Sequence, residues 1–327
     1  MNLRRILILL PLLLIGGAAA AYVDHYQHLH PSTSDAYLGM HVVDISAQVS
    51  GPVALVAVLS HQAVKRGDTL FRIDPKPFAL ALQKADADLQ QARQAQRATQ
   101  AQVVTAQAQV DAAQASLREA RRHTARVMKL VQKGTASKDD GDAARKALKE
   151  AQDALAVAQA QKAAAIARRG ADGDDNAAIK LAMAVRDQAQ LDLQHTRVLA
   201  PADGIVGEVD LRAGSFVTAG QGLFALVETG DVWVDANFKE TDLVRIHPGL
   251  PAQVTVDMAP GKTFNGRVVS LSPASGTAFS LFPPENATGN WVKVTQRFPV
   301  RVHILDPAPG LRLGASSEVT INTTQSP

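Results

Sequence analysis

The sequence contains no cysteine. This absence excludes disulfide bonds, zinc sites built from thiolates, cysteine nucleophiles and any lipid anchor attached through a cysteine. Aromatic residues make up only 4% of the chain, whereas alanine and glutamine are abundant in its first half. Low aromatic content combined with alanine- and glutamine-rich stretches favours long helices that pack through small side chains.

Motifs of several enzyme classes are also absent. The chain has no G-x-S-x-G nucleophile elbow, no H-E-x-x-H zinc motif and no phosphate-binding P-loop. We therefore expect no enzyme activity, no catalytic residue, no cofactor and no metal site. The net charge of +3 is too small to indicate a nucleic-acid partner. His25, His28 and His30 are close enough in sequence to bind a metal, but we interpret them as part of a polar linker.

One long uncharged apolar segment occurs, from Ile6 to Val23, and Arg4 and Arg5 precede it. Its length is near the lower limit for crossing a bilayer, ~17–25 residues, and the preceding arginines keep the short N-terminus cytoplasmic. This predicts a membrane anchor over residues 1–24. The predicted anchor residues include Ile6, Leu10 and Leu14.

The same segment also fits a cleaved signal peptide. Its apolar region would run from Ile6 to Ile15, and the alanines at 18–20 would form an A-x-A cleavage site. Under either interpretation the rest of the chain lies outside the cytoplasm. No later segment is long and apolar enough to span a membrane, so we do not expect the protein itself to be a transporter.

Residues 77–197 have the pattern of long helices. Between Phe78 and Gln132, apolar and small residues recur every seven positions in two sets, and no helix breaker interrupts them. A seam sustained over about seven heptads indicates a coiled coil. The first set is Leu82, Leu89, Val103, Val110, Leu117 and Val131, with Gln96 and Thr124 in its gaps; the second is Ala85, Ala92, Ala106, Ala113, Ala120 and Val127, with Thr99 in its gap.

A short turn follows this first helix. Gly134 ends the helix, and Ser137 is a candidate cap for a second one with Asp139 and Asp140 in its first turn. The second arm is interrupted at residues 170–175, by a kink or by a joint between two helices. Long helices joined by a short turn predict an antiparallel hairpin within one chain. The turn disfavours the alternative, an independent dimerising coiled coil.

Two β-patterned segments, residues 37–76 and 198–229, flank the hairpin. In each, a strand crosses a glycine turn, a second turn follows with Lys65-Arg-Gly-Asp68 or Ala219-Gly-Gln-Gly222, and another strand comes next. Glycine at these turns supplies the positive φ values that other residues resist. The pattern resembles the two halves of a lipoyl/biotinyl domain. Such domains carry a modified lysine between their halves, near the position of Lys76. Since the hairpin replaces that turn, we interpret Lys76 as an ordinary residue at a helix start.

Residues 230–323 alternate short strands with turns. Strands are predicted at 232–238, 252–257, 263–271 and 300–304, with a short helix over 239–246. This pattern predicts a small β-barrel with one helix.

A long connection follows between residues 275 and 290. Pro283 and Pro284 exclude it from a central strand, and it is rich in apolar residues. We expect a contact loop for a transporter or a neighbouring subunit; the alternative is that it folds back over the barrel. The predicted loop contacts are Phe279, Leu281, Phe282 and Asn286.

Five segments together resemble a known family along nearly the whole chain. They are residues 35–37, 41–51, 71–75, 232–243 and, most diagnostic, 279–297. They resemble the HlyD/EmrA-type membrane fusion proteins, which are periplasmic adaptors, and most of all the EmrA branch. The resemblance implies a multidomain α+β fold: an N-terminal transmembrane helix, a lipoyl-like β-sandwich interrupted by a long antiparallel coiled-coil hairpin, and a small β-barrel.

The resemblance also implies a function and partners. The expected role is a link between an inner-membrane drug efflux transporter, usually a proton-driven major facilitator pump, and a TolC-like outer-membrane channel. It implies a single-pass inner-membrane protein, mostly periplasmic, that forms a trimer or hexamer. It favours an anchor over a signal peptide. The alternative is an adaptor of a type I protein secretion system that works with an ABC transporter.

The hairpin tip carries one further match. Arg126, Leu130 and Ser137 have the spacing R-x3-L-x6-S, with which related adaptors contact the outer-membrane channel. An arginine donates several hydrogen bonds and a leucine fills a groove. The alternative is that Arg126 is an ordinary surface residue, Leu130 a residue of the helix seam and Ser137 only a helix cap. We expect channel contact by these three residues.

Overall fold

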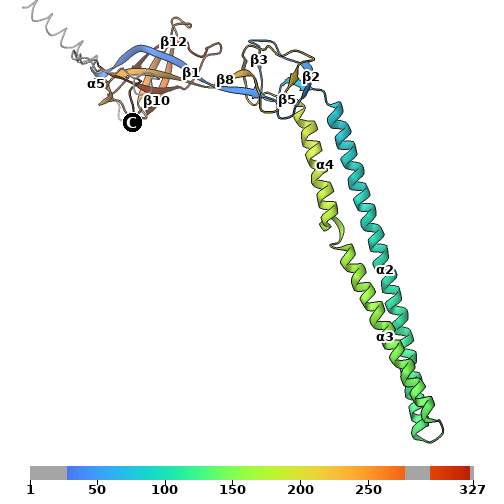
Figure 1. Cartoon of the computed structure of the whole chain (residues 1–327). Helices are drawn as coiled ribbons and strands as arrows, with labels where there is room; N and C mark the ends of the chain where they lie inside the picture. The colour runs from blue at the N-terminus through green and yellow to red at the C-terminus, as the bar shows by residue number, and fades with distance from the viewer. Residues whose placement is uncertain (1–27, 277–294, 325–327) are drawn as a thin grey trace, which may run out of the picture. The chain divides into compact units, whose positions relative to one another are not determined.

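The computed structural model describes residues 28–276 and 295–324 of the 327-residue chain. The chain divides into two compact units (Figure 1). One combines the residues up to Arg72 with those from Val198 onward, and the other comprises Ile73–Arg197.

A closed β-barrel forms part of the first unit. Its strands follow the order β1-β12-β9-β10-β11-β8, and a pairing of β8 with β1 closes the ring. Along β9, β12 and the barrel part of β8 (residues 232–238), buried residues alternate with more exposed ones, which gives each strand one apolar face, as a half-buried strand requires. The strands are β1 Ser32–Ser46, β8 Gly222–Lys239, β9 Pro251–Val256, β10 Thr263–Leu271, β11 Arg297–Ile304 and β12 Ser316–Ile321.

The barrel interior is filled by aliphatic side chains. Val234, Val254 and Val302, from three different strands, are fully buried there. The short helix α5 (Glu240–Leu243) ends three residues before the predicted position 246. After Leu243 the helical hydrogen bonds give way to shorter turn bonds, in which the N–H groups of Arg245 and Ile246 donate to Asp242 and Leu243, and Ile246 is buried in the barrel core.

The lipoyl-like part of the first unit combines short strands from both halves. One sheet has the order β5-β4-β2-β7, and β3 and β6 extend the barrel sheet beyond β8. Phe71 and Phe224, one from each half, meet edge to face at 6.1 Å. The strands are β2 Gly51–Val56, β3 Ala63–Val64, β4 Thr69–Ile73, β5 Arg197–Leu199, β6 Gly204–Val206 and β7 Phe216–Val217.

The second glycine turn of each half is confirmed, whereas Gly51 and Gly204 of the first turns begin strands and have no positive φ. Gly67 and Gly220 have φ values of +90° and +81°, a region that other residues avoid. The N–H of Gly67 donates to the carbonyl of Ala200, and that of Gly220 donates to Ala47. Each turn is therefore closed by the opposite half of the sequence.

The first strand differs from the prediction. Residues 37–76 were expected to belong to the lipoyl-like half alone, yet Leu38 and Met40 are buried in the barrel core. β1 pairs with β8 from Ala36 to Ser46, so both strands run from the barrel into the lipoyl-like part. The boundary at residue 37 is therefore wrong, because one continuous strand serves both parts.

The second unit is a helical hairpin. Helix α2 (Lys76–Gln132) has 57 residues, about 85 Å at 1.5 Å per residue. Helix α3 (Lys138–Arg169), the 3-10 turn η1 (Gly173–Asp175) and helix α4 (Ala177–His195) form the returning arm. Both α3 and α4 run alongside α2 (Figure 1).

The predicted seam faces the returning arm. Ala85, Leu89, Ala106, Val110 and Leu117 are buried, and the other residues of both predicted sets are at least half-buried. Thr124, a polar residue in a seam gap, is 8% exposed. Its hydroxyl lies 3.0 Å from the carbonyl oxygen of Ala144 on α3. The hairpin is thus formed within one chain, as predicted.

The interruption of the returning arm is a joint between two helices. Gly170 adopts φ +70° and ψ −149°, which ends α3, and Asn176 caps α4. Three side chains of α2 contact the joint. Gln96 donates to the carbonyl of Gly173, Gln100 accepts from Arg169, and Arg93 lies 3.4 Å from the Asp174 carboxylate.

Several predicted residues lie outside the described part of the chain. These are the anchor residues Ile6, Leu10 and Leu14 and the loop residues Phe279, Leu281, Phe282 and Asn286. Within residues 28–276 and 295–324, no helix combines the length and apolar character needed to cross a membrane. The same residues contain no cluster of histidine and carboxylate side chains suited to a metal ion.

Candidate partner-binding site at the hairpin tip

The tip is built by a capped turn between α2 and α3. Gly134, with φ +76°, reverses the chain, and the N–H of Thr135 donates to the carbonyl of Leu130. Ser137 then begins α3 through a reciprocal capping box: its hydroxyl accepts from the N–H of Asp140, and the Asp140 carboxylate accepts from the N–H of Ser137. These bonds satisfy groups that a helix start leaves unpaired.

The cap also affects the ionisation of Asp140. The Ser137 hydroxyl donates to Asp140 Oδ2 at 2.7 Å, and this bond, followed by the Ser137 N–H, lowers the pKa of Asp140 below its usual value. Asp140 therefore stays ionised at the start of α3, where the helix dipole favours a negative charge.

The three predicted tip residues differ in what they offer a partner. Arg126 and Leu130 lie one helical turn apart on α2, so they share a face. The Leu130 side chain is 47% exposed, and Arg126 is exposed with only a solvent-facing ion pair to Glu119 at 3.3 Å. Ser137 lies across the turn, and its hydroxyl already belongs to the cap. Arg126 and Leu130 are therefore the more available groups.

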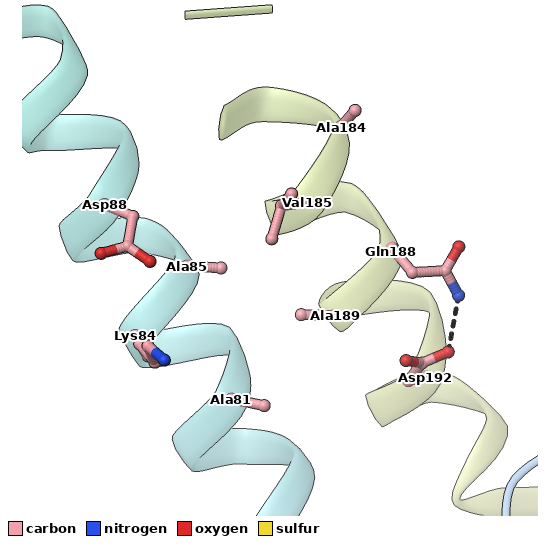
Figure 2. Close-up of a pocket in the computed structure, with 9 residues that line it drawn as sticks. All are labelled: Ala81, Lys84, Ala85, Asp88, Ala184, Val185, Gln188, Ala189 and Asp192. Carbon is pink, nitrogen blue, oxygen red and sulfur yellow. Dashed lines mark hydrogen bonds between the residues drawn. The ribbon is translucent and has the colours of Figure 1, made fainter. Parts of the chain in front are cut away.

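A groove between α2 and α4 was not predicted. It measures about 550 Å³, and Figure 2 shows its floor of small side chains, including Ala85 of α2 and Ala189 of α4. Charged and amide groups form its rims, where Gln188 donates to Asp192 (Figure 2). The alanines that let α2 and α3 approach closely leave space here. The sequence did carry a signal for this groove, because alanines occupy seam positions at both ends of α2.

The outer face of the barrel holds a second unpredicted cluster. Trp233 contacts both Arg301, whose guanidinium lies over the ring at 4.7 Å from its centroid, and His41, whose ring meets it edge-on at 4.8 Å. Asp235 accepts from the Trp233 indole and from two nitrogens of Arg301. The hydrogen bonding of Arg301 to Asp235, with the nearby Asp231 carboxylate, raises the pKa of Arg301. Alternation along β8 predicts an outward Trp233, but it does not predict its partners from other strands.

Comparisons with known proteins agree with this architecture. A family model described as "RND MFP, barrel-sandwich hybrid domain" matches residues 41–229, and one described as "CusB-like, beta-barrel domain" matches residues 231–278. The chain is 38% identical over 300 residues to the fatty acid resistance protein FarA of Neisseria gonorrhoeae, covering 89% of this chain and 76% of FarA. It is 37% identical over 303 residues to the multidrug resistance protein MdtN of Escherichia coli K12, covering 88% of each.

Among solved structures, the periplasmic adaptor protein EmrA matches at 21% identity with a TM-score of 0.45, covering 90% of this chain and 99% of EmrA. The first family model spans more than half of the chain, and relatives above 30% identity extend along most of its length. The multidrug export protein EmrA of Haemophilus influenzae is also 33% identical over 324 residues, covering 97% of this chain and 83% of that protein. The chain therefore belongs to the membrane fusion protein family, as a member of the EmrA type.

Proposed function

We propose that the protein is a non-enzymatic periplasmic adaptor. It links an inner-membrane drug efflux transporter, of the major facilitator type, to a TolC-like outer-membrane channel through which toxic small molecules leave the cell. Two relatives support a role in resistance, since FarA is a fatty acid resistance protein and MdtN a multidrug resistance protein.

The observation that carries the proposal is the hairpin. A 57-residue helix that pairs with its own returning arm is far longer than a compact core needs, and it ends in a capped turn with Arg126 and Leu130 exposed. Such an element suits reaching a distant partner. In the proposed assembly, residues 1–24 anchor the chain in the inner membrane and the barrel with its 275–290 loop contacts the transporter. Several copies, three or six, assemble so that their hairpins surround a common path to the channel.

The absence of native cysteine makes a crosslinking test clean. A single cysteine placed at the tip by Lys138→Cys is reacted in cells with a thiol-to-amine crosslinker, and the captured protein is identified by mass spectrometry. The proposal expects an outer-membrane channel. The matched control is Lys84→Cys on the groove rim of α2, near the start of that helix, which is expected to capture no channel.

Two results would count against the proposal. An expressed, membrane-anchored Lys138→Cys protein that captures no channel removes the tip from the interface. Equal channel capture from Lys84→Cys shows that the crosslinker reports proximity along the whole helix rather than docking at its tip.

A further inference from the structure

The last four turns of α2 carry an unusual charge distribution. Between residues 118 and 133 the sequence contains six lysines and arginines and one acidic residue, Glu119. Five of the six basic residues follow one another at spacings of three or four positions, and all five are exposed. At 100° per residue they fall within an arc of about 80°, and they extend over about 22 Å of helix. We call them the basic stripe: Arg118, Arg122, Arg126, Lys129 and Lys133.

The basic stripe is not neutralised by the hairpin itself. Arg126 contacts Glu119, but within the described residues Arg118, Arg122, Lys129 and Lys133 form no ion pair. Like charges four positions apart on a helix destabilise it slightly. The stripe contains three such pairs, so it does not serve the stability of α2.

The neighbouring helix shows the opposite arrangement. On α3, Arg145 pairs with Asp142, Lys146 with Glu150, and Lys149 with Asp153. Of the cations on this stretch of the hairpin, three of the four on α3 are thus paired, whereas four of the five in the basic stripe are not. General solubility would not require this difference.

The helix dipole explains only part of the stripe. Cations stabilise a helix C-terminus, and Lys129 and Lys133 lie in the last turn and at the cap. The effect fades beyond one turn. Arg118 and Arg122 lie about three turns or more before the end of α2, so another cause is needed for them.

We propose that the basic stripe binds an acidic α-helical surface of a partner protein laid alongside α2. A straight row of cations with steps of about 6 Å matches carboxylates that recur every three to four residues on a facing helix. Arg126 belongs both to the stripe and to the predicted tip contact, so the two surfaces are continuous. The inference rests on the proposed function, in which the tip meets a channel. It specifies the chemistry of the channel surface that the hairpin contacts.

The test uses the full-length protein in detergent and defined probes. The first is a labelled, stapled helical peptide with five glutamates on one face at three- and four-residue spacing. The second has the same composition with the glutamates distributed around the helix. Purified peptidoglycan sacculi, tested by co-pelleting, represent a flexible polyanion. Fluorescence anisotropy at low and high salt measures the affinity of both peptides.

Matched variants separate the stripe from the rest of the hairpin. The stripe variant is R118Q/R122Q/K129Q/K133Q, and the control variant is R145Q/K146Q/K149Q on α3. Glutamine favours helices about as well as lysine and arginine, and circular dichroism verifies the fold. We expect the one-faced peptide to bind the wild type and the control alike and the stripe variant about tenfold more weakly, since four exposed ion pairs of small individual value are lost. High salt should remove this difference.

Three outcomes overturn the inference. Equal binding of both peptides shows general charge attraction rather than recognition of a helix face. An equal loss of peptide affinity in the α3 control shows that the position of the cations on the hairpin is irrelevant. Sacculi that bind through the stripe while the one-faced peptide does not indicate a cell-wall polymer as the ligand. None of these results depends on a channel, so they are distinguishable from a failure of Lys138→Cys capture.

Discussion

At the scale of single residues, close packing of the barrel surface depends on Gly39. A side chain at this position would meet the indole of Trp233, its partner in the β1–β8 pairing. We expect Gly39→Ala to displace the indole, to break its hydrogen bond to Asp235 and to destabilise the first unit by about 1–3 kcal/mol, the usual cost of overpacking. Thermal unfolding followed by tryptophan fluorescence measures this change. Gly230→Ala, in open space on β8, is the control and should have little effect.

A second residue-scale prediction concerns the cap. Ser137→Ala removes the hydroxyl that accepts from the Asp140 N–H and donates to its carboxylate, so the first turn of α3 should open more easily by about 1 kcal/mol. Amide hydrogen exchange at Asp140 and Gly141, whose N–H groups donate to Ser137, should rise about fivefold. Ser137→Thr retains a capping hydroxyl and should stay close to the wild type. Unchanged exchange in Ser137→Ala would show that the cap is not what holds the turn.

The same bond gives the tip a pH dependence. The pKa of Asp140 is lowered in the folded state, so its contribution is complete above the unfolded value of about 4 and is lost as pH falls through the lower folded value. Protection of the tip amides should therefore decline in acid. In Ser137→Ala the pKa of Asp140 should rise toward its ordinary value, and NMR titration of the carboxylate measures it directly.

At the scale of elements, the long helices were the most predictable part of the chain. A seven-residue period repeats many times over α2, so each buried position is supported by others, and Gly134 and Ser137 mark the turn chemically. The sequence did not distinguish a kink from a joint at residues 170–175. That outcome depends on Arg93, Gln96 and Gln100, which lie about 70–80 positions earlier in the chain and meet the joint only in the folded hairpin.

The joint leads to an element-scale prediction. Gly170 has φ +70° and ψ −149°, a conformation almost restricted to glycine. Gly170→Ala should therefore destabilise the returning arm by about 1–3 kcal/mol. Hydrogen exchange at residues 166–180 should increase, while exchange at the tip should not. Asp174→Ala removes only an exposed contact with Arg93 and should cost less than about 0.5 kcal/mol. A similar loss in both variants would assign the effect to the ion pair and not to backbone strain.

The strands were less predictable than the helices because their neighbours also lie far away in the sequence. The second-turn glycines of the lipoyl-like halves are local signals, and the structure confirms them. No local signal marks the passage of β1 from the barrel to the lipoyl-like part near His41, because the strand continues through it with only a register shift after Met40. The predicted boundary failed there, since the barrel closes through a partner strand nearly 200 residues away.

At the scale of the whole molecule, the proposed bridge makes hairpin length a functional quantity. Removing one heptad from each arm, residues 103–109 and 159–165, keeps the seam in register, because Thr124 opposite Ala144 and Gln100 opposite Arg169 fix the antiparallel alignment. It shortens the hairpin by about 10 Å and leaves the tip intact. We expect this variant to fold and to reach the membrane, yet to lose drug resistance and Lys138→Cys capture of the channel. A control of full length, with the same heptads replaced by residues 110–116 and 152–158, should retain both. Full resistance in the shortened variant would contradict a bridge of defined length, because an adaptor that only activates its transporter does not depend on where its tip ends.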